Sequence, residues 1–254
     1  MLNLNYKEFG QGDPLIILHG LFGMLDNWQT IAKKLAEHFT VFLIDQRNHG
    51  KSPHADEHNY EAMAEDLHDF MTSKWIYKAH IIGHSMGGKT AMLFATEYPD
   101  FVKTLTVVDI APKTYLAGHN QIFNALISME LEKVESRKDA EDMLEPDIQS
   151  PAIRQFLLKN LKRSKNGQYL WKMNLPILYK NYEDILKSCL GEETFEGETL
   201  FVKGGQSGYI QMEDIETIHA HFPKAKIETI NSAGHWIHAE APHAFLKIVE
   251  DFLL

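Results

Sequence analysis

The chain has 254 residues, of which 44% are hydrophobic and 24% are charged. This is enough to bury the core of one large domain, or of one domain that carries an insertion. Its 25 basic and 35 acidic residues leave a net charge of −10. We therefore expect no nucleic acid partner and no binding to an anionic membrane, because both require a basic surface. The single cysteine, Cys189, cannot form an internal disulfide.

The beginning of the chain has no basic segment followed by an apolar one, so we expect no signal peptide. The longest apolar runs, such as residues 15–18, are far shorter than the roughly 18 residues that a membrane-spanning helix needs. We expect a cytoplasmic protein that is a monomer or a small homo-oligomer.

Short apolar runs, which predict buried strands, alternate along the chain with amphipathic segments, which predict helices. The expected strands are residues 15–18, 41–44, 79–82, 105–108, 199–202 and 226–230. The expected helices begin near residues 28, 60, 86, 212 and 242. This alternation predicts an α/β fold with a mostly parallel, twisted sheet flanked by helices.

Between residues 113 and 198 the alternation stops and the pattern becomes helical. Ser136 can cap one helix, and Ser150 followed by Pro151 opens another that we expect to run through Leu161. Asn166-Gly167 predicts a turn. We predict a core made of residues 1–112 and 199–254, with residues 113–198 inserted as a helical cap over the carboxyl ends of the strands.

The strongest motif is Gly83-His-Ser85-Met86-Gly87, a G-x-S-x-G pattern between a predicted strand and a predicted helix. In this setting the serine occupies a sharp turn, and the small flanking residues let the strand and helix approach each other. Ser85 is the expected nucleophile. The backbone N–H of Met86, at the start of the helix, is expected to point toward a developing oxyanion.

His19-Gly20-Leu21-Phe22-Gly23 follows the first buried strand. A loop of this kind supplies the second oxyanion donor, for which we choose the Leu21 N–H ahead of the Phe22 N–H. The His19 side chain is expected to organise the loop through backbone hydrogen bonds.

A serine nucleophile needs a proton acceptor, and His235 is the expected base because it follows the last predicted strand and lies downstream of Ser85. We interpret His238 as structural. Four other histidines are assigned to helices or loops away from the strand ends, namely His54, His58, His68 and His119.

The acidic partner of His235 is less clear from the pattern. Its usual position, after the strand that precedes the last one, holds Ser207, which cannot carry a charge. Asp109, at the end of an earlier strand, is the preferred acid, with Glu213 and Asp214 in reserve. Ser207 is expected to hydrogen-bond His235 or Asp109 and to complete a four-member catalytic network.

These segments, together with Asp45-Gln-Arg-Asn-His-Gly-Lys-Ser52, resemble the α/β-hydrolase superfamily over nearly the whole chain. More closely they resemble the YbfF-type bacterial esterases and their animal abhydrolase relatives. The resemblance implies hydrolysis of carboxylesters or acyl thioesters without a cofactor. It also implies that Ser85, His235 and Asp109 match the nucleophile, the histidine and an aspartate of that group.

We expect a small ester or an acyl thioester of the acyl-CoA type as substrate, without a metal ion. The expected walls of the substrate pocket are Phe22, Phe123, Leu126, Trp171 and Trp236. A local basic cluster that includes Lys162 and Arg163 is interpreted first as a solvated helix face, and second as a site for the phosphates of CoA.

Two alternatives remain open at this point. One is the same fold with carbon–carbon bond hydrolysis or Ser/His-dependent lyase chemistry. The other is a ligand-binding protein that keeps the hydrolase fold without catalysis.

Overall fold

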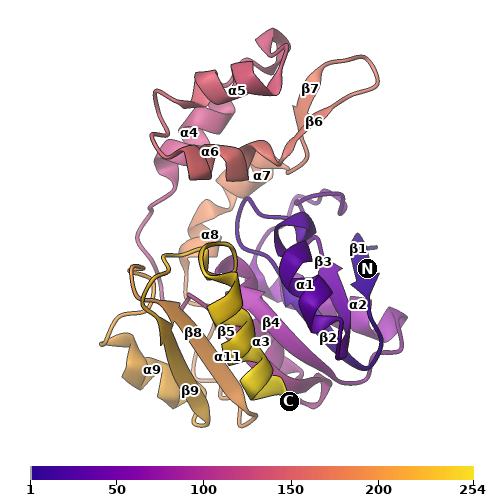
Figure 1. Cartoon of the computed structure of the whole chain (residues 1–254), viewed down its shortest axis with the longest axis vertical. Helices are drawn as coiled ribbons and strands as arrows, with labels where there is room; N and C mark the ends of the chain where they lie inside the picture. Colours follow the sequence, from indigo (N-terminus) through magenta and orange to yellow (C-terminus); the bar gives the residue numbers. More distant parts are fainter. Residues whose placement is uncertain (1) are drawn as a thin grey trace.

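The structure is a computed structural model that describes residues 2–254. A twisted sheet of seven strands forms the middle layer of the core, and an inserted segment stands on one edge of this core (Figure 1). The strand order is β1-β3-β2-β4-β5-β8-β9. The strands are β1 (Tyr6–Phe9), β2 (Asp13–Leu18), β3 (Phe39–Ile44), β4 (Ala79–His84), β5 (Val102–Val108), β8 (Thr199–Gly204) and β9 (Ala225–Ile230).

All neighbouring strands of this sheet are parallel except β1, which pairs with β3 in the antiparallel direction. The six parallel strands confirm the predicted α/β fold. The sequence analysis missed β1, because its four residues include Lys7 and Glu8 and lack the apolar run by which the other strands were found. A short, charged strand at the edge of a sheet also discourages pairing with another chain.

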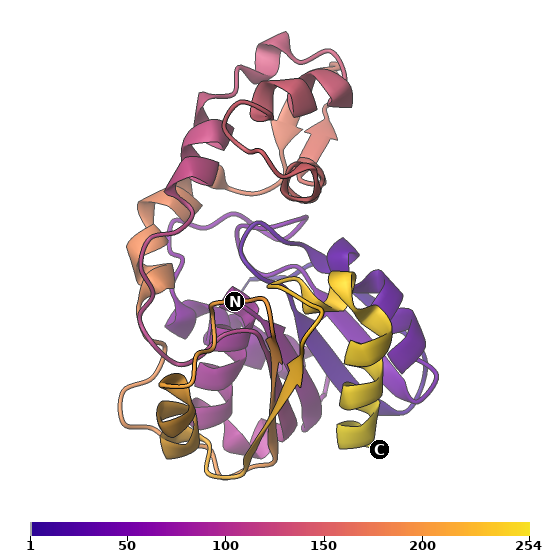
Figure 2. The ribbon, with the colours of Figure 1, turned by 60° about the vertical axis from the view of Figure 1, so that its left-hand side comes forward.

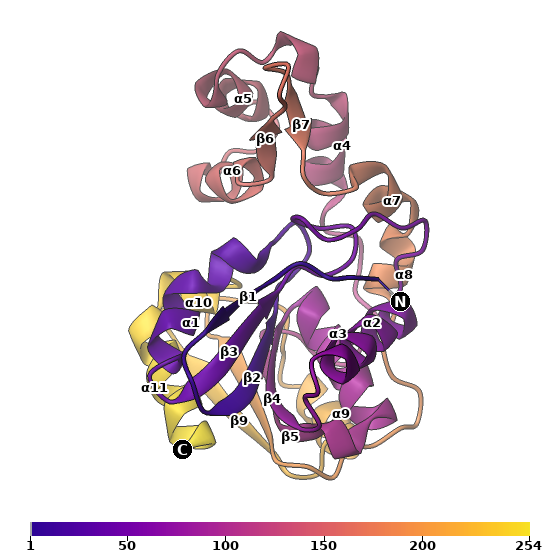
Figure 3. The ribbon, with the colours of Figure 1, turned by 90° about the vertical axis from the view of Figure 1, so that its right-hand side faces the viewer.

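Helices cover both faces of the sheet, as Figure 3 shows. One face carries α1 (Gln29–Leu35) and α11 (Pro242–Leu253), and the other carries α2 (Tyr60–Ser73), α3 (Met86–Glu97) and α9 (Asp214–His221). In β2, Leu15 and Ile17 pack into the first layer while Ile16 and Leu18 pack into the second. Successive side chains of a strand point to opposite faces, so a strand covered on both faces is apolar throughout.

The inserted segment follows β5 and precedes β8, and it stands above the carboxyl ends of the strands (Figures 1 and 2). Its helices are α4 (Asn120–Ser128), α5 (Arg137–Leu144), α6 (Pro151–Leu158), α7 (Leu175–Lys180) and α8 (Tyr182–Leu186). Ser136 caps α5 by accepting a hydrogen bond from the Asp139 N–H, as the sequence predicts, and Ser150 accepts the Ile153 N–H at the start of α6.

The insertion is not wholly helical. Helix α6 ends at Leu158, and a two-stranded antiparallel hairpin follows, made of β6 (Leu161–Arg163) and β7 (Tyr169–Trp171). The expected helix through Leu161 and the helical basic face are therefore wrong: Lys162 and Arg163 lie on β6. The turn predicted at Asn166-Gly167 closes the hairpin, with Gly167 at φ 85°, a left-handed conformation that glycine adopts readily.

The remaining elements are short. They are the helix α10 (Ile237–Glu240) and three 3₁₀ segments, η1 (Leu25–Trp28), η2 (Pro99–Phe101) and η3 (Leu131–Lys133). Within residues 2–254, no helix is both long enough and apolar enough to span a membrane.

Several histidines are buried beneath the inserted segment rather than exposed. His19, His49 and His58 form a chain of ring contacts, with centroids 5.0 Å and 5.6 Å apart. Burial lowers the pKa of His19 to about 4 and, together with the charge of His19, lowers that of His49 to about 3. These rings are neutral in the folded protein at neutral pH, and His58 is not the solvated residue that the sequence analysis expected.

Stability is predicted to fall as the pH drops from about 7 to 4.5. In that window the buried histidines take up protons once the chain is unfolded, but they stay neutral in the folded chain. Protons therefore favour unfolding. Each fully buried histidine contributes a loss of about 2 kcal/mol at pH 5. Urea unfolding at several pH values measures this dependence. His49→Gln should flatten it, whereas the exposed control His38→Gln should leave it unchanged; an unflattened slope in His49→Gln would contradict the prediction.

Candidate active site

Ser85 lies at the junction of β4 and α3, directly before the first residue of the helix. Its backbone has φ 53° and ψ −119°, a strained conformation for a residue with a side chain. Two backbone hydrogen bonds hold it there: the Ser85 N–H donates to the Val108 carbonyl (3.0 Å), and the Ser85 carbonyl accepts the Lys89 N–H (3.0 Å). The turn leaves the Ser85 side chain half-buried at a cavity.

The glycines around Ser85 are required by close backbone contact. A Cβ atom on Gly83 would stand 2.2 Å from the Gly87 carbonyl oxygen, and one on Gly87 would stand 2.6 Å from the carbonyl oxygens of Leu18 and His19. A side chain on Gly83 would force β4 away from α3, and one on Gly87 would force α3 away from the end of β2. The strand–turn–helix setting that the G-x-S-x-G motif predicts is therefore present.

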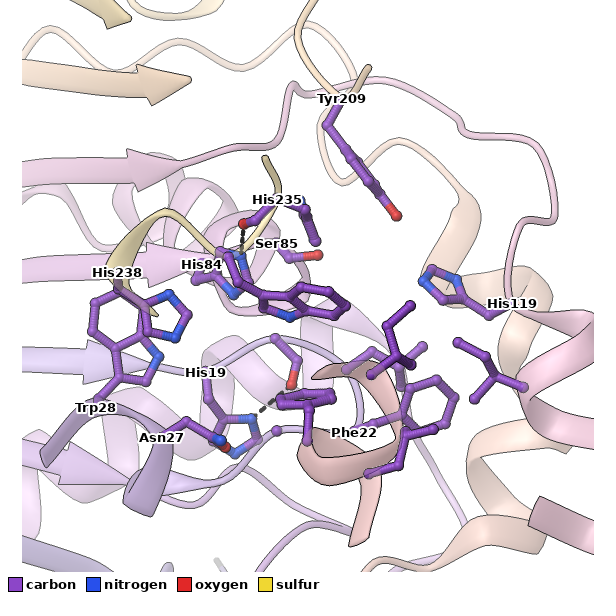
Figure 4. Close-up of a pocket in the computed structure, with 18 of the residues that line it drawn as sticks. His19, Phe22, Asn27, Trp28, His84, Ser85, His119, Tyr209, His235 and His238 are labelled. Atoms are coloured by element: carbon purple, nitrogen blue, oxygen red, sulfur yellow. Dashed lines mark hydrogen bonds between the residues drawn. The ribbon is translucent and has the colours of Figure 1, made fainter. Parts of the chain in front are cut away.

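The imidazole of His235 lies in the loop after β9 and borders the same cavity as Ser85 (Figure 4). Its Nδ1–H donates to Oδ2 of Asp109 at 2.8 Å. Because a carboxylate only accepts, this bond leaves Nε2 of the neutral ring without a proton and able to accept one.

Asp109 follows β5 and is fully buried, with φ 51°. Its Oδ1 accepts the Gly204 N–H at 2.9 Å, and its Oδ2 accepts the Ser207 hydroxyl as well as the His235 ring. Hydrogen bonds thus join three members of the predicted network, Asp109, His235 and Ser207, and the fourth, Ser85, borders the same cavity as His235. Ser207 bonds Asp109, which was one of the two partners expected for it.

The two reserve acids lie elsewhere. Asp214 is paired with Lys113 at 2.6 Å, and it also accepts the Gln211 N–H. Glu213 is the N-cap residue of α9. Neither has a hydrogen bond to His235, whereas Asp109 does, so the geometry favours Asp109 as the partner of the imidazole.

Two neighbours orient the His235 ring. Tyr209 stacks on it, with ring centroids 3.9 Å apart and an interplanar angle of 17°. His84 donates its Nε2–H to the His235 carbonyl at 2.8 Å. Burial lowers the pKa of His84 well below its usual value, so this ring remains a neutral donor. No sequence pattern indicates either role: His84 is the unspecified residue of the G-x-S-x-G motif, and Tyr209 lies two positions beyond Ser207.

The loop after β2 lies against the Ser85 turn: a Cβ on Gly20 would stand 3.1 Å from the Ser85 Cβ. His19 organises this loop as expected, since its Nδ1–H donates to the Gly20 carbonyl (2.9 Å) and its Nε2 accepts the Gln46 N–H (3.1 Å). Leu21 borders the cavity beside Ser85. Met86 is the first residue of α3, so its N–H has no acceptor within the helix.

Two cavities meet at this site. We call the first, of about 260 Å³, the apolar cavity, and Figure 4 shows Phe22 in its wall. Five histidines line it together with hydrophobic side chains, which are Leu21, Phe22, Trp28, Ile122, Ile153, Phe156, Leu157 and Trp236. The second, of about 420 Å³, is called the lysine cavity, after Lys89 in its wall. Four residues border both: Leu21, Ser85, His119 and Tyr209.

Only two of the five expected pocket walls line these cavities, Phe22 and Trp236. Phe123 is fully buried behind Phe22, with ring centroids 4.9 Å apart, and Leu126 is buried in the core. Trp171 lies on β7 opposite Leu161 and packs on the core from outside the cavities. The assignments of Phe123, Leu126 and Trp171 as pocket walls are therefore wrong. Their positions on α4 and on the hairpin point these side chains into packing contacts and away from the cavities.

His119 is the reverse case. The sequence analysis placed it away from the strand ends, yet it borders both cavities. Burial lowers its pKa to about 4, so the ring is neutral near pH 7. His119 is the N-cap residue of α4, in the inserted segment. No local sequence pattern shows that this residue reaches the site.

No group of three or more histidine, cysteine, aspartate or glutamate side chains within residues 2–254 is arranged to hold a metal ion. Cys189 is buried, and burial raises the pKa of its thiol to about 12, so it is not a reactive thiolate at neutral pH.

Comparison with known proteins agrees with this architecture. The α/β hydrolase fold family matches residues 13–242, and the chain belongs to this family. It is 43% identical to the sn-1-specific diacylglycerol lipase ABHD11 of Danio rerio, over 99% of this chain and 83% of that protein. It is 36% identical to Esterase YbfF of Escherichia coli (strain K12), over 94% of this chain and 92% of that protein.

Among solved structures, a marine microorganism esterase superposes with a TM-score of 0.98 and 46% sequence identity, and each chain is covered completely. These relatives confirm the resemblance drawn from the sequence motifs. They support a hydrolase of the esterase and lipase type.

A methyl group at Gly83 is predicted to destabilise the fold. Gly83→Ala places a Cβ against the Gly87 carbonyl, and an overpacked contact of this kind costs about 1–3 kcal/mol in the free energy of unfolding. Urea unfolding measures the loss. The matched control is Gly118→Ala, whose Cβ meets nothing within 4 Å and should change stability by less than about 0.5 kcal/mol. Equal stabilities for the two variants would contradict the packing argument.

Proposed function

We propose that the protein is a serine hydrolase that cleaves carboxylesters through an acyl-enzyme intermediate. The observation that carries this proposal is the placement of Ser85, on its strained turn, at one cavity with His235, whose ring is hydrogen-bonded to the buried Asp109. A serine, a histidine with a free Nε2 and a carboxylate behind that histidine form the recurring arrangement for acyl transfer.

In the proposed mechanism Ser85 attacks the ester carbonyl while Nε2 of His235 accepts its proton. His235 then gives that proton to the leaving alcohol. Later it takes a proton from the water that attacks the acyl-enzyme and returns it to the Ser85 oxygen as the carboxylic acid leaves. Asp109 holds the ring in the required tautomer and stabilises the imidazolium ion. Ser207 and the Gly204 N–H hold Asp109 in turn.

The oxyanion of each tetrahedral intermediate is assigned to the backbone N–H groups of Leu21 and Met86. The support is positional: Met86 begins α3, and the loop that carries Leu21 packs against the Ser85 turn. Preorganised backbone donors at such a position contribute about 10²–10³ in kcat each.

The apolar cavity is assigned to a hydrocarbon group of the ester, on the acyl or the alcohol side of the carbonyl. Its volume of about 260 Å³ and its aromatic and aliphatic walls suit a short or medium hydrocarbon chain, with Phe22 and Trp236 beside it. The names of the similar proteins, an esterase and a diacylglycerol lipase, agree with an ester substrate. We therefore favour esters over the acyl-CoA thioesters that the sequence also allowed, since Lys162 and Arg163 lie on the hairpin instead of a cavity wall.

Ser85→Ala is expected to remove turnover, because no other side chain replaces the nucleophile. Hydrolysis of nitrophenyl esters of graded chain length measures it, and circular dichroism checks that the fold is kept. Labelling of wild-type Ser85 by a fluorophosphonate probe separates catalysis from mere ligand binding. Full esterase activity in Ser85→Ala would overturn the proposal, and a wild-type protein that is neither labelled nor active would favour the non-catalytic alternative.

Asp109→Asn is expected to lower kcat by about 10⁴, since the amide favours the wrong tautomer of His235. The matched control is Asp214→Asn, the same chemical change at a carboxylate that pairs with Lys113 instead of His235. Near-normal activity in Asp109→Asn combined with a large loss in Asp214→Asn would reverse the assignment of the acid.

The other chemistries of this fold are resolved by identifying products. Release of an alcohol and an acid from an ester supports the proposal. If the protein cleaves acyl-CoA thioesters or a carbon–carbon bond faster than esters, or releases its product by elimination, that activity replaces carboxylester hydrolysis as the function. For the thioester case, the double variant Lys162→Glu/Arg163→Glu shows whether the basic hairpin contributes to KM.

A further inference from the structure

The mechanism above leaves one buried charged group unused, the side chain of Lys89. It is one helical turn beyond Ser85 on α3, it is 1% exposed, and it forms part of the wall of the lysine cavity. This cavity is the larger of the two that meet at Ser85. A lysine at such a position is uncommon, because burial of an ammonium group is costly unless it is paired.

The neighbouring residues satisfy only part of the hydrogen-bonding capacity of Lys89. Its Nζ donates to the carbonyl oxygens of Leu186 (3.2 Å) and Lys187 (2.6 Å), at the end of α8. It also lies 4.9 Å and 5.5 Å from the ring centroids of Tyr115 and Tyr60. An ammonium group has three donors, and the third has no acceptor within residues 2–254.

No carboxylate balances this charge within the part of the chain that the structure describes. The wall of the lysine cavity contains two lysines, Lys89 and Lys113, and no aspartate or glutamate. Lys113 is already neutralised by Asp214, at 2.6 Å. Burial without a counterion lowers the pKa of Lys89 to about 8, which still leaves it mostly charged at neutral pH.

We propose that the lysine cavity binds a substrate arm that ends in a carboxylate, with Lys89 as its ion-pair partner. The inference rests on the proposed function and adds a substrate class to it: half-esters of short dicarboxylic acids. The esterified carbonyl lies at Ser85, and the free carboxylate supplies the acceptor and the counterion that Lys89 lacks.

The short spacing of Ser85 and Lys89 along α3 favours a short arm. Ser85 and Lys89 are four residues apart, which is roughly 6 Å along the helix axis. A chain of about five carbon atoms spans this range, so glutarate half-esters are the first choice. The net charge of −10 disfavours the approach of such anions, and a buried cation at the site offsets that repulsion locally.

A purely structural role for Lys89 must be separated from this binding role, because its bonds to residues 186 and 187 join α3 to the inserted segment. The measured quantity is the ratio of kcat/KM for monoethyl glutarate to kcat/KM for ethyl pentanoate. The two substrates share a five-carbon acyl chain and the same leaving group. A general disturbance of the site lowers both values and leaves their ratio unchanged.

Lys89→Met is expected to lower this ratio about 10- to 100-fold, which is the range for loss of a charge-assisted hydrogen bond. Lys89→Arg, which keeps the charge, should retain a higher ratio than Lys89→Met. The matched control is Lys34→Met, the same change at an exposed lysine of α1, and its ratio should equal that of the wild type. An unchanged ratio in Lys89→Met would overturn the inference.

A second measurement needs no variant. The wild-type ratio should fall as the pH rises through about 8, where Lys89 loses its proton. The groups that face Lys89 do not change charge there: burial raises the pKa of Tyr60, Tyr115 and Cys189 above this range, and His119 across the cavity is neutral above pH 4. In Lys89→Arg the ratio should not depend on pH in this window. A pH-independent wild-type ratio would count against the proposal.

The two proposals fail in different ways. If Ser85 is labelled and ethyl pentanoate is hydrolysed, but the ratio responds neither to Lys89→Met nor to pH, the inference is wrong and the proposed function stands. If the wild type hydrolyses neither ester and Ser85 is not labelled, the proposed function is wrong and the inference falls with it.

Discussion

The whole site depends on the close approach of β4 and α3. Their backbones meet at Gly83 and Gly87, at distances that no Cβ atom could tolerate. This contact forces Ser85, the residue between them, into a left-handed conformation that aims its side chain away from the packed core. The strain is held by the sheet beneath it, since the Ser85 N–H bonds to the last residue of β5. The reactive group is thus presented by rigid elements instead of a mobile loop.

A second constraint joins the strand ends to one another. Asp109 follows β5, is buried, and is bonded by the end of β8, by Ser207 and by the ring of His235 after β9. Partners that lie 95, 98 and 126 residues beyond Asp109 therefore converge on one carboxylate. Because the strands between them are parallel, their carboxyl ends lie on the same edge of the sheet, where α/β proteins place their ligands.

Hydrogen bonds from side chains to backbone carbonyl groups attach the inserted segment to the core. Tyr60 donates to the Ile185 carbonyl (2.6 Å), Lys89 donates to the carbonyl groups that follow, and Asn160 of the insertion donates to the Phe22 carbonyl (2.6 Å). These bonds fix the height of the insertion above Ser85, and so they set the shape of both cavities. The same arrangement explains why Lys89 combines a structural contact with a place in a cavity wall.

Local periodicity and glycine at fixed spacing predicted six of the seven strands of the main sheet, the turn at Ser85 and the position of His235. The sequence by itself did not reveal β1, whose four residues lack an apolar run, or the hairpin, whose Asn166-Gly167 turn was visible but whose strands are only three residues long. Tertiary structure alone decided which carboxylate faces His235 and which side chains line the cavities. Those relations join residues about a hundred positions apart, and a long-range contact depends on how packed layers meet, which no local pattern encodes.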